Sequence, residues 1–175
     1  LNAKISRPSV CNALDTVVVD AEIAAVFLPM LVNGFSTAKV SVWADEAAFQ
    51  ILEQAGLSTL HQAETQDFGR EFLSLGCSIK VVSGLEEALA HIQQYSSRHS
   101  EAIMSEDVEV SERFLKEVDA AAVYANASTR FTDGGAFGLG AEIGISTQKL
   151  HARGPFALEK LTTEKWVLRG NGQIR

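Results

Sequence analysis

The chain has 175 residues, of which 46% are hydrophobic and 21% charged, so it is long and apolar enough to fold around one ordinary core. Intrinsic disorder is typical of chains with fewer apolar residues and is not expected here. The 22 acidic residues outnumber the 15 basic ones and give a formal charge of −7. This balance argues against a surface that binds nucleic acid.

Two cysteines, Cys11 and Cys77, are too few for a disulfide framework, and neither has metal-ligand spacing to a histidine. A reducing compartment and no metal are therefore expected. The chain starts without an initiator Met, lacks a signal-peptide pattern, and has a longest apolar stretch (residues 23–32) that is too short to cross a bilayer. We expect a soluble, cytoplasmic protein without a membrane partner, cut from a longer chain.

The first half of the chain alternates between strand and helix patterns. Residues 14–19 are β-branched and predict a strand, and the apolar segment 22–32 predicts a helix that Gly34 ends. A second strand is expected over 39–44, followed by a helix with Asp45 as its N-cap.

The same order continues after a polar stretch (58–69) that we expect to be irregular. Residues 78–82 predict a buried strand, and Ser83 with Glu86 forms a capping-box pattern before a helix that runs to Tyr95.

Further along, strands over 102–104 and 121–124 flank a helix over 108–118 that Ser105 would cap. Strands that alternate with helices of this length pair in parallel through right-handed crossovers. The predicted fold class is α/β, a layered and mostly parallel sheet with flanking helices. A last strand is expected over 165–169, with a type I′ turn at Asn171-Gly172.

The glycine-rich segment 126–144 does not match a nucleotide-binding fingerprint, because its glycines lack the G-x-G-x-x-G and G-K-[ST] spacings. It is either a turned or flexible loop whose glycines need positive φ, or a site loop, since ligands sit at the carboxyl ends of parallel strands.

Few side chains stand out as chemical candidates. Cys11, just ahead of the first strand, is either a nucleophile or an inert thiol, whereas Cys77 is expected in the core. The four histidines lack paired spacing, so neither a zinc site nor a Cys-His pair can be inferred, although His99 lies in a loop and is available. Arg130 is either the cation for an anionic ligand or a solvated loop residue.

Three segments carry a resemblance to a known family. Residues 126–135 (NASTRFTDGG) and 137–155 (FGLGAEIGISTQKLHARGP) closely resemble the γ-glutamyl phosphate reductase family, as does the pattern around His91 and His99 within 82–103. The segment 7–13 (RPSVCNA) resembles the surroundings of that family's catalytic cysteine. The chain departs from the family pattern at Phe68, Ser96 and Cys77.

The resemblance implies a domain organisation. The family is a branch of the aldehyde dehydrogenase superfamily, so residues 1–160 would form the α/β catalytic domain and 161–175 a strand or hairpin of the oligomerisation element. Most of the NADPH-binding domain would lie outside this chain. The full protein would then be a homo-oligomer.

The resemblance also implies a reaction, the NADPH-dependent reduction of L-glutamyl 5-phosphate to L-glutamate 5-semialdehyde. Cys11 would be the catalytic nucleophile. The substrate pocket would be lined by Ser128, Thr129, Arg130 and His99. Glu71, in a Glu-x-Phe-like element, would contact the cofactor. The alternatives are the reductase half of a bifunctional pyrroline-5-carboxylate synthase and a non-catalytic oligomerisation module.

Overall fold

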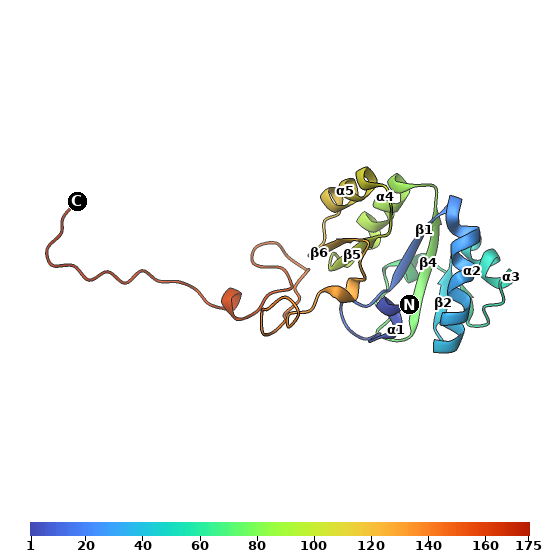
Figure 1. Cartoon of the computed structure of the whole chain (residues 1–175), viewed down its shortest axis with the longest axis horizontal. Helices are drawn as coiled ribbons and strands as arrows, with labels where there is room; N and C mark the ends of the chain where they lie inside the picture. The colour runs from blue at the N-terminus through green and yellow to red at the C-terminus, as the bar shows by residue number, and fades with distance from the viewer.

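The computed structural model describes all 175 residues and shows a layered α/β body from which the last residues extend away (Figure 1). Four parallel strands form the main sheet in the order β1 (Thr16–Asp20), β4 (Gly76–Val82), β2 (Ser41–Ala44) and β3 (Leu60–Gln62). A second, two-stranded parallel sheet joins β5 (Ser100–Ile103) and β6 (Ala122–Ala125). The predicted α/β fold class is confirmed.

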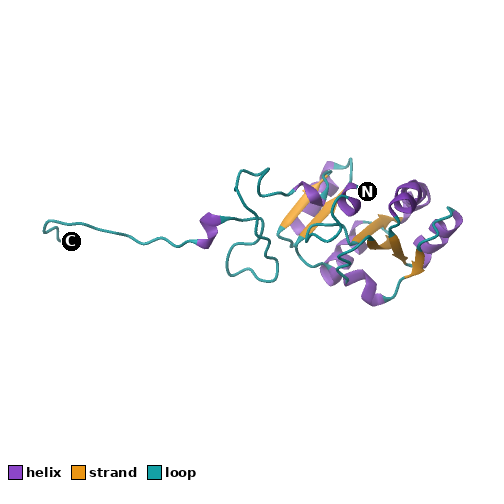
Figure 2. Cartoon of the chain, turned by 90° about the horizontal axis from the view of Figure 1, so that it is seen from below, coloured by secondary structure: helices purple, strands orange, loops and turns teal.

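Four longer helices accompany the strands (Figure 2): α2 (Ala21–Ala38), α3 (Glu46–Gln54), α4 (Leu85–Tyr95) and α5 (Val108–Glu117). The remaining elements are short, namely α1 (Asn2–Ile5) and the 3₁₀ turns η1 (Thr65–Gly69), η2 (Thr129–Phe131) and η3 (Leu158–Leu161). Because α2 and α3 pack on the main sheet, they supply much of the core. This core contains Val19, Ala24, Leu28, Phe35, Val40, Val42, Ala44, Ala48, Leu52, Leu57, Cys77 and Ile79.

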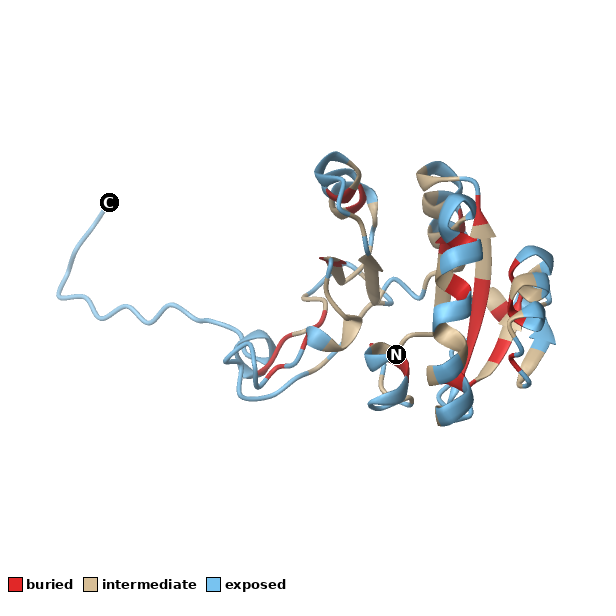
Figure 3. Cartoon of the chain, turned by 45° about the vertical axis from the view of Figure 1, so that its right-hand side comes forward, coloured by how far each residue is buried: buried red, intermediate tan, exposed pale blue.

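The central strand β4 is buried on both faces for most of its length, as Figure 3 shows along the main sheet. Cys77 and Ile79 point into the core under α2 and α3. Ser78, which lies between them, is also fully buried, and its hydroxyl forms a hydrogen bond with the Thr16 hydroxyl on β1 at 2.8 Å. A buried polar group in a strand is therefore hydrogen-bonded, as its desolvation requires.

Helix α2 is longer than predicted because Gly34 lies inside it and does not end it. A Cβ at Gly34 would lie 2.6 Å from the side chain of Leu1, so glycine is needed there for close approach. Lys39, with φ of 55°, adopts the left-handed conformation that ends the helix instead. The complete helix is long and apolar enough by length and composition to cross a membrane, but its inner face packs on the sheet.

Other boundaries differ from the predictions through local side-chain bonding. Asp45 caps α3 as predicted, but the capping box at Ser83 does not form, because Glu87 rather than Glu86 accepts the Ser83 N–H. Asp107 caps α5, whereas Ser105, the predicted cap, only accepts a hydrogen bond from the backbone N–H of Asp107.

The polar stretch 58–69 is not wholly irregular, since it contains β3 and η1. Residues 165–169, expected as a strand, belong to no helix or strand in the single chain, and their side chains are exposed. Only Gly172 of the Asn171-Gly172 pair has positive φ, whereas a type I′ turn needs it at both positions. The terminal turn is therefore not of type I′.

A buried ion pair fixes the segment that precedes β1. Lys4 of α1 is fully buried, and its Nζ lies 3.4 Å from Asp15 Oδ1. The same carboxylate accepts the backbone N–H of Phe72 at 3.1 Å. One side chain thus connects α1, the start of β1 and the segment before β4.

We expect Asp15→Ala to destabilise the chain by about 3 kcal/mol, because it leaves the Lys4 ammonium buried without a counter-charge. Lys4→Met should cost less, about 1 kcal/mol, since the Asp15 carboxylate is partly exposed and keeps the Phe72 N–H. Urea unfolding of both variants and of the double variant measures these costs. Equal losses in the two single variants would contradict the ion-pair account.

Candidate active site

Cys11 lies in a tight turn between α1 and β1, where its thiol is exposed. The turn is closed by the Ala13 N–H, which donates to the Val10 carbonyl at 2.9 Å. The backbone N–H of Cys11 donates to no acceptor in the structure. The thiol thus lies beside a free backbone N–H group. It lies at the amino end of β1, whereas ligand sites of parallel sheets usually lie at the carboxyl ends of strands.

Asn12 anchors this turn to a distant loop. Its side chain is 3% exposed; the amide nitrogen donates to the Thr132 carbonyl at 3.1 Å, and the amide oxygen accepts from the Arg130 guanidinium. The Thr129 hydroxyl donates to the Asn12 carbonyl at 2.7 Å. Residues 129–132 are therefore held against the cysteine turn by one buried side chain and its backbone.

The predicted substrate residues of this loop are partly engaged within the protein. The Ser128 hydroxyl donates to Asn2 Oδ1 at 2.8 Å, and Thr129 and Arg130 bind Asn12. The Arg130 Nε is buried and has no acceptor. Ser128 and Thr129 thus position the loop, while Arg130 keeps a donor available; substrate binding by all three stays a prediction.

The glycine-rich loop is packed tightly on itself. Residues 143 and 156 pair as an antiparallel bridge, and the Gly154 N–H donates to the Ile145 carbonyl at 3.1 Å. A Cβ at Gly154 would lie 2.3 Å from the Gly144 Cα, so this crossing requires glycine. The loop is therefore tightly folded. Close approach of the backbone, rather than a positive φ, explains why position 154 is glycine.

His99 is brought to the same place from the start of β5. A Cβ at Gly144 would lie 2.8 Å from His99 Nε2 and 3.7 Å from Cys11 Sγ, so both atoms border this glycine. His99 Nδ1 shares a hydrogen bond with the Ser100 hydroxyl at 2.7 Å, whereas Nε2 is buried without a partner. The sequence indicated no Cys-His pair, because 87 residues lie between the two positions and only the fold of the loop brings both to the same glycine.

The electrostatics of His99 have opposing causes. Burial lowers its pKa below the ordinary value for histidine, the carboxylates of Glu142 and Glu71 raise it, and Arg153 lowers it. Both carboxylates are thus near the imidazole. Glu142 escaped the sequence analysis, since a carboxylate within a glycine-rich loop has no spacing signal; it also accepts the Gly134 N–H at 3.4 Å.

Glu71 is exposed, and no hydrogen bond or ion pair engages its carboxylate. Its neighbour Phe72 is buried against Trp43, with ring centroids 5.0 Å apart, and holds the backbone in place. A carboxylate that has no partner and stands on a fixed backbone can accept hydrogen bonds from the hydroxyls of a sugar. The structure therefore agrees with a cofactor contact at Glu71, which stays a prediction.

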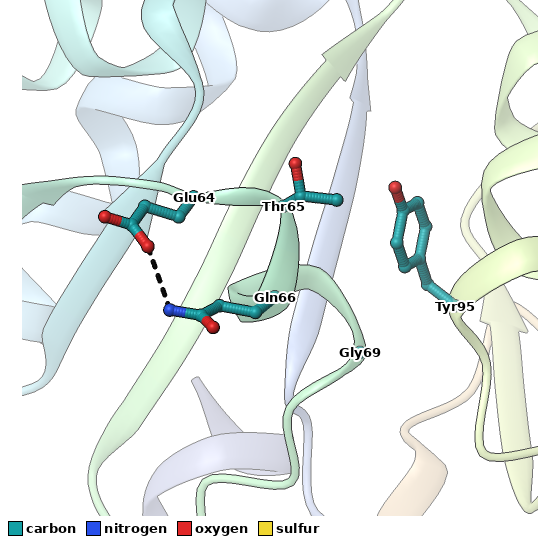
Figure 4. A pocket seen from close by; sticks show the side chains of 5 residues that line it. All are labelled: Glu64, Thr65, Gln66, Gly69 and Tyr95. Carbon is teal, nitrogen blue, oxygen red and sulfur yellow. Dashed lines mark hydrogen bonds between the residues drawn. The ribbon is translucent and has the colours of Figure 1, made fainter.

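Other titratable groups and hollows lie apart from this cluster. Cys77 is fully buried, and burial raises the pKa of its thiol to about 12, consistent with the predicted core role. No group of three or more His, Cys, Asp or Glu side chains is arranged to hold a metal ion. An open hollow of about 540 Å³ lies between η1 and the end of α4, where Tyr95 faces Thr65 (Figure 4); none of the cluster's residues line it.

Comparison with known proteins gives a consistent result. No protein-family model matches. Two curated relatives, the γ-glutamyl phosphate reductases of Pelodictyon phaeoclathratiforme and Legionella pneumophila (strain Paris), are 63% and 57% identical over 175 residues, which is 99% of this chain. The crystal structure of γ-glutamyl phosphate reductase from Thermotoga maritima superposes on 99% of the chain with a TM-score of 0.87 and 46% identity.

The resemblance to γ-glutamyl phosphate reductases is confirmed. The chain spans about two fifths of the length of these relatives, 42% of both curated proteins and 41% of the Thermotoga maritima chain. An acetylating aldehyde dehydrogenase from Geobacillus thermoglucosidasius, 21% identical with a TM-score of 0.50, shares the fold over 74% of the chain. The γ-glutamyl phosphate reductase resemblance and the aldehyde dehydrogenase-type fold thus agree.

The two cysteines should differ sharply in reactivity. We expect iodoacetamide at pH 8 to modify one thiol per folded chain, at Cys11, because Cys77 is buried and its pKa is raised to about 12. Peptide mass mapping identifies the modified residue. Unfolding in urea should expose the second thiol, and modification of Cys77 in the folded chain would contradict the structure.

Proposed function

We propose that this chain is the catalytic part of a γ-glutamyl phosphate reductase. The reaction is the NADPH-dependent reduction of L-glutamyl 5-phosphate to L-glutamate 5-semialdehyde and phosphate in proline biosynthesis, through a cysteine thioester. The observation that carries the proposal is the exposed Cys11 thiol, held by Asn12 against the loop that contains Arg130. The identity to named reductases over the whole chain supports it.

Cys11 is suited to attack an acyl phosphate. A thiolate is a strong nucleophile at neutral pH, and its attack on the acyl carbon expels phosphate and leaves a thioester. The developing oxyanion needs donors that are not already engaged. The Cys11 backbone N–H, which has no acceptor in the structure, meets that requirement.

An anionic substrate also needs fixed cationic donors. The Arg130 guanidinium is oriented by the Asn12 amide oxygen and retains the buried, unpartnered Nε. A guanidinium held this way can bind a carboxylate or phosphate oxygen with little loss of side-chain entropy. Ser128 and Thr129, which bond to Asn2 and Asn12, keep the segment that carries Arg130 in place and would complete this wall of the substrate pocket.

NADPH, when bound, supplies the hydride that reduces the thioester. In this chain Glu71 would accept hydrogen bonds from a ribose hydroxyl, for which its unengaged carboxylate is suited. The phosphates would be held by a segment outside this chain, since the glycine-rich loop lacks the fingerprint spacing. A free catalytic thiol agrees with a reducing, cytoplasmic location.

Two other functions remain distinct hypotheses. The reductase half of a bifunctional pyrroline-5-carboxylate synthase would carry the same site, and the sequence upstream of Leu1 distinguishes it. A non-catalytic oligomerisation module needs neither an exposed Cys11 nor the Asn12 tether, so the structure favours the enzyme.

The decisive variant is Cys11→Ala in a protein of the relatives' full length that contains this chain. We expect loss of the reduction of γ-glutamyl phosphate with NADPH binding retained, because the attacking atom is removed. NADPH oxidation measures the activity, and fluorescence titration measures the binding. Cys77→Ala is the matched control and should keep activity at a cost of about 1 kcal/mol in stability.

We also propose that residues 161–175 add a strand to a partner subunit. Trp166 and Leu168 are 91% and 84% exposed in the single chain, and an apolar segment of this kind is stable in water only when covered. Trp166→Glu in the full-length protein should therefore shift the oligomer toward monomers. Light scattering after gel filtration measures the mass, and a wild-type protein that is monomeric at micromolar concentration would exclude this role.

A further inference from the structure

The structure contains a buried polar atom beside Cys11 that has no partner within the protein. His99 Nε2 is shielded from solvent and makes no hydrogen bond. Leaving a buried polar atom unpaired costs free energy, about 1–3 kcal/mol in measured cases. Such an atom next to an exposed thiol indicates that a ligand completes its hydrogen bonding.

Gly144 determines what the atom faces. The position of a Cβ at Gly144 is 2.8 Å from His99 Nε2 and 3.7 Å from Cys11 Sγ, and glycine leaves this position empty. The bridge between Ile143 and Phe156 fixes the backbone there. The imidazole nitrogen and the thiol sulfur therefore lie against the same glycine.

Ser100 is compatible with the tautomer that a proton acceptor needs, because its hydroxyl can accept a hydrogen bond from His99 Nδ1. When His99 Nδ1 carries the hydrogen and donates to the Ser100 hydroxyl at 2.7 Å, the Nε2 lone pair is free to accept a proton. The surrounding charges are Glu142, Glu71 and Arg153. Burial favours the neutral imidazole at rest, while the two carboxylates stabilise the imidazolium once a proton arrives.

We propose that His99 is a catalytic proton shuttle, which takes the proton of the Cys11 thiol at Nε2 and delivers it to the departing phosphate. This role rests on the proposed function and deepens it. It differs from the substrate-binding role that the resemblance implies, since the imidazole transfers a proton rather than only holding the ligand.

The proton balance of the first half of the reaction, the formation of the thioester, supports a single group that accepts the thiol proton and then donates it to the phosphate. The S–C bond forms and the bond between the acyl carbon and the phosphate oxygen breaks. The phosphate leaves as a dianion that carries the former thiol proton, so no proton is taken from solvent. Without that proton the leaving group would be trianionic phosphate, a far more basic and slower leaving group. No electrons are transferred in this half.

A second buried histidine provides a matched comparison. His91 on α4 is 6% exposed and also has an unpartnered Nε2, but its ring packs against Phe68 and Tyr95 at centroid distances of 5.4 and 4.8 Å. Its charged neighbours are Lys80, Glu87 and Asp45. It has no nucleophile beside it, so it shares the burial of His99 without the proposed chemistry.

The test uses the full-length protein with two acyl donors, γ-glutamyl phosphate and the p-nitrophenyl ester of the same acyl group. Single-turnover release of phosphate or p-nitrophenolate, without NADPH, isolates the acylation half. We expect His99→Gln to slow phosphate release about 10²–10⁴-fold, the usual range for general acid–base catalysis. The ester at pH 9.5 should lose less than about tenfold, since p-nitrophenolate leaves without a proton and hydroxide can take the thiol proton at this pH.

The pH profile supplies a second measurement. In the wild-type protein, the rate of phosphate release should fall as the pH drops below about 6.5, because protonation of His99 removes the base, and its lowered pKa places this limb on the acid side. His99→Gln should lose that limb, whereas His91→Gln should keep both the limb and the rate. If His99→Gln fails to fold, Ser100→Ala, which frees the tautomer, should give a smaller loss of the same kind.

The outcomes separate the two proposals. Equal losses with phosphate and with the ester would show that His99 only shapes the pocket and would overturn the shuttle. Unchanged phosphate release in His99→Gln, together with an inactive Cys11→Ala, would overturn the shuttle and leave the proposed function standing. Full activity in Cys11→Ala would overturn both.

Discussion

The candidate site depends on one buried amide. Asn12 connects the turn that presents Cys11 to residues 129–132, which are separated from it by almost the whole folded part of the chain. A nearly fully buried amide needs hydrogen-bond partners within the protein, and here its nitrogen donates to the Thr132 carbonyl while its oxygen accepts from Arg130. The requirement to satisfy this group holds Cys11 and Arg130, the proposed nucleophile and the proposed anion-binding residue, in fixed relative positions.

The parallel sheets supply the frame on which this tether acts. The Asp15–Lys4 pair places α1 and the cysteine turn at the amino end of β1, while the long loop departs from the carboxyl end of β6 and passes His99 at the amino end of β5. The site thus forms where a loop crosses strand ends of both kinds. This explains why the general rule for parallel sheets located the loop correctly but not Cys11 or His99.

Elements of the fold with strong periodicity could be predicted from the sequence. The strands around Val18, Val42 and Ile79 lie within two residues of the predicted bounds, because buried β-branched runs give a clear signal. The edge strand β3 was missed, since two of its three residues are His61 and Gln62 and carry no apolar pattern. Gly34 was misread as a helix end because its reason, contact with Leu1, is tertiary.

The site shows the same division between local and tertiary information. Cys11 and Arg130 could be named as candidates from the sequence, and the family resemblance gave them roles that stay predictions; the structure shows that the thiol is exposed and that Arg130 is bound by Asn12. Glu142 and the approach of His99 to Cys11 were not predicted, because both depend on how the loop folds back between residues 143 and 156.

That folded loop also explains how one histidine can accept and release a proton. An isolated buried imidazole would hold a proton too weakly to accept it, and one paired closely with a carboxylate would hold it too strongly to release it. Here burial and Arg153 lower the pKa of the imidazole, Glu142 and Glu71 raise it, and the ring is hydrogen-bonded only to the Ser100 hydroxyl. Burial is the largest of these contributions, so the pKa is lowered and the imidazole at rest is neutral, which is the state that the proposed proton acceptor requires.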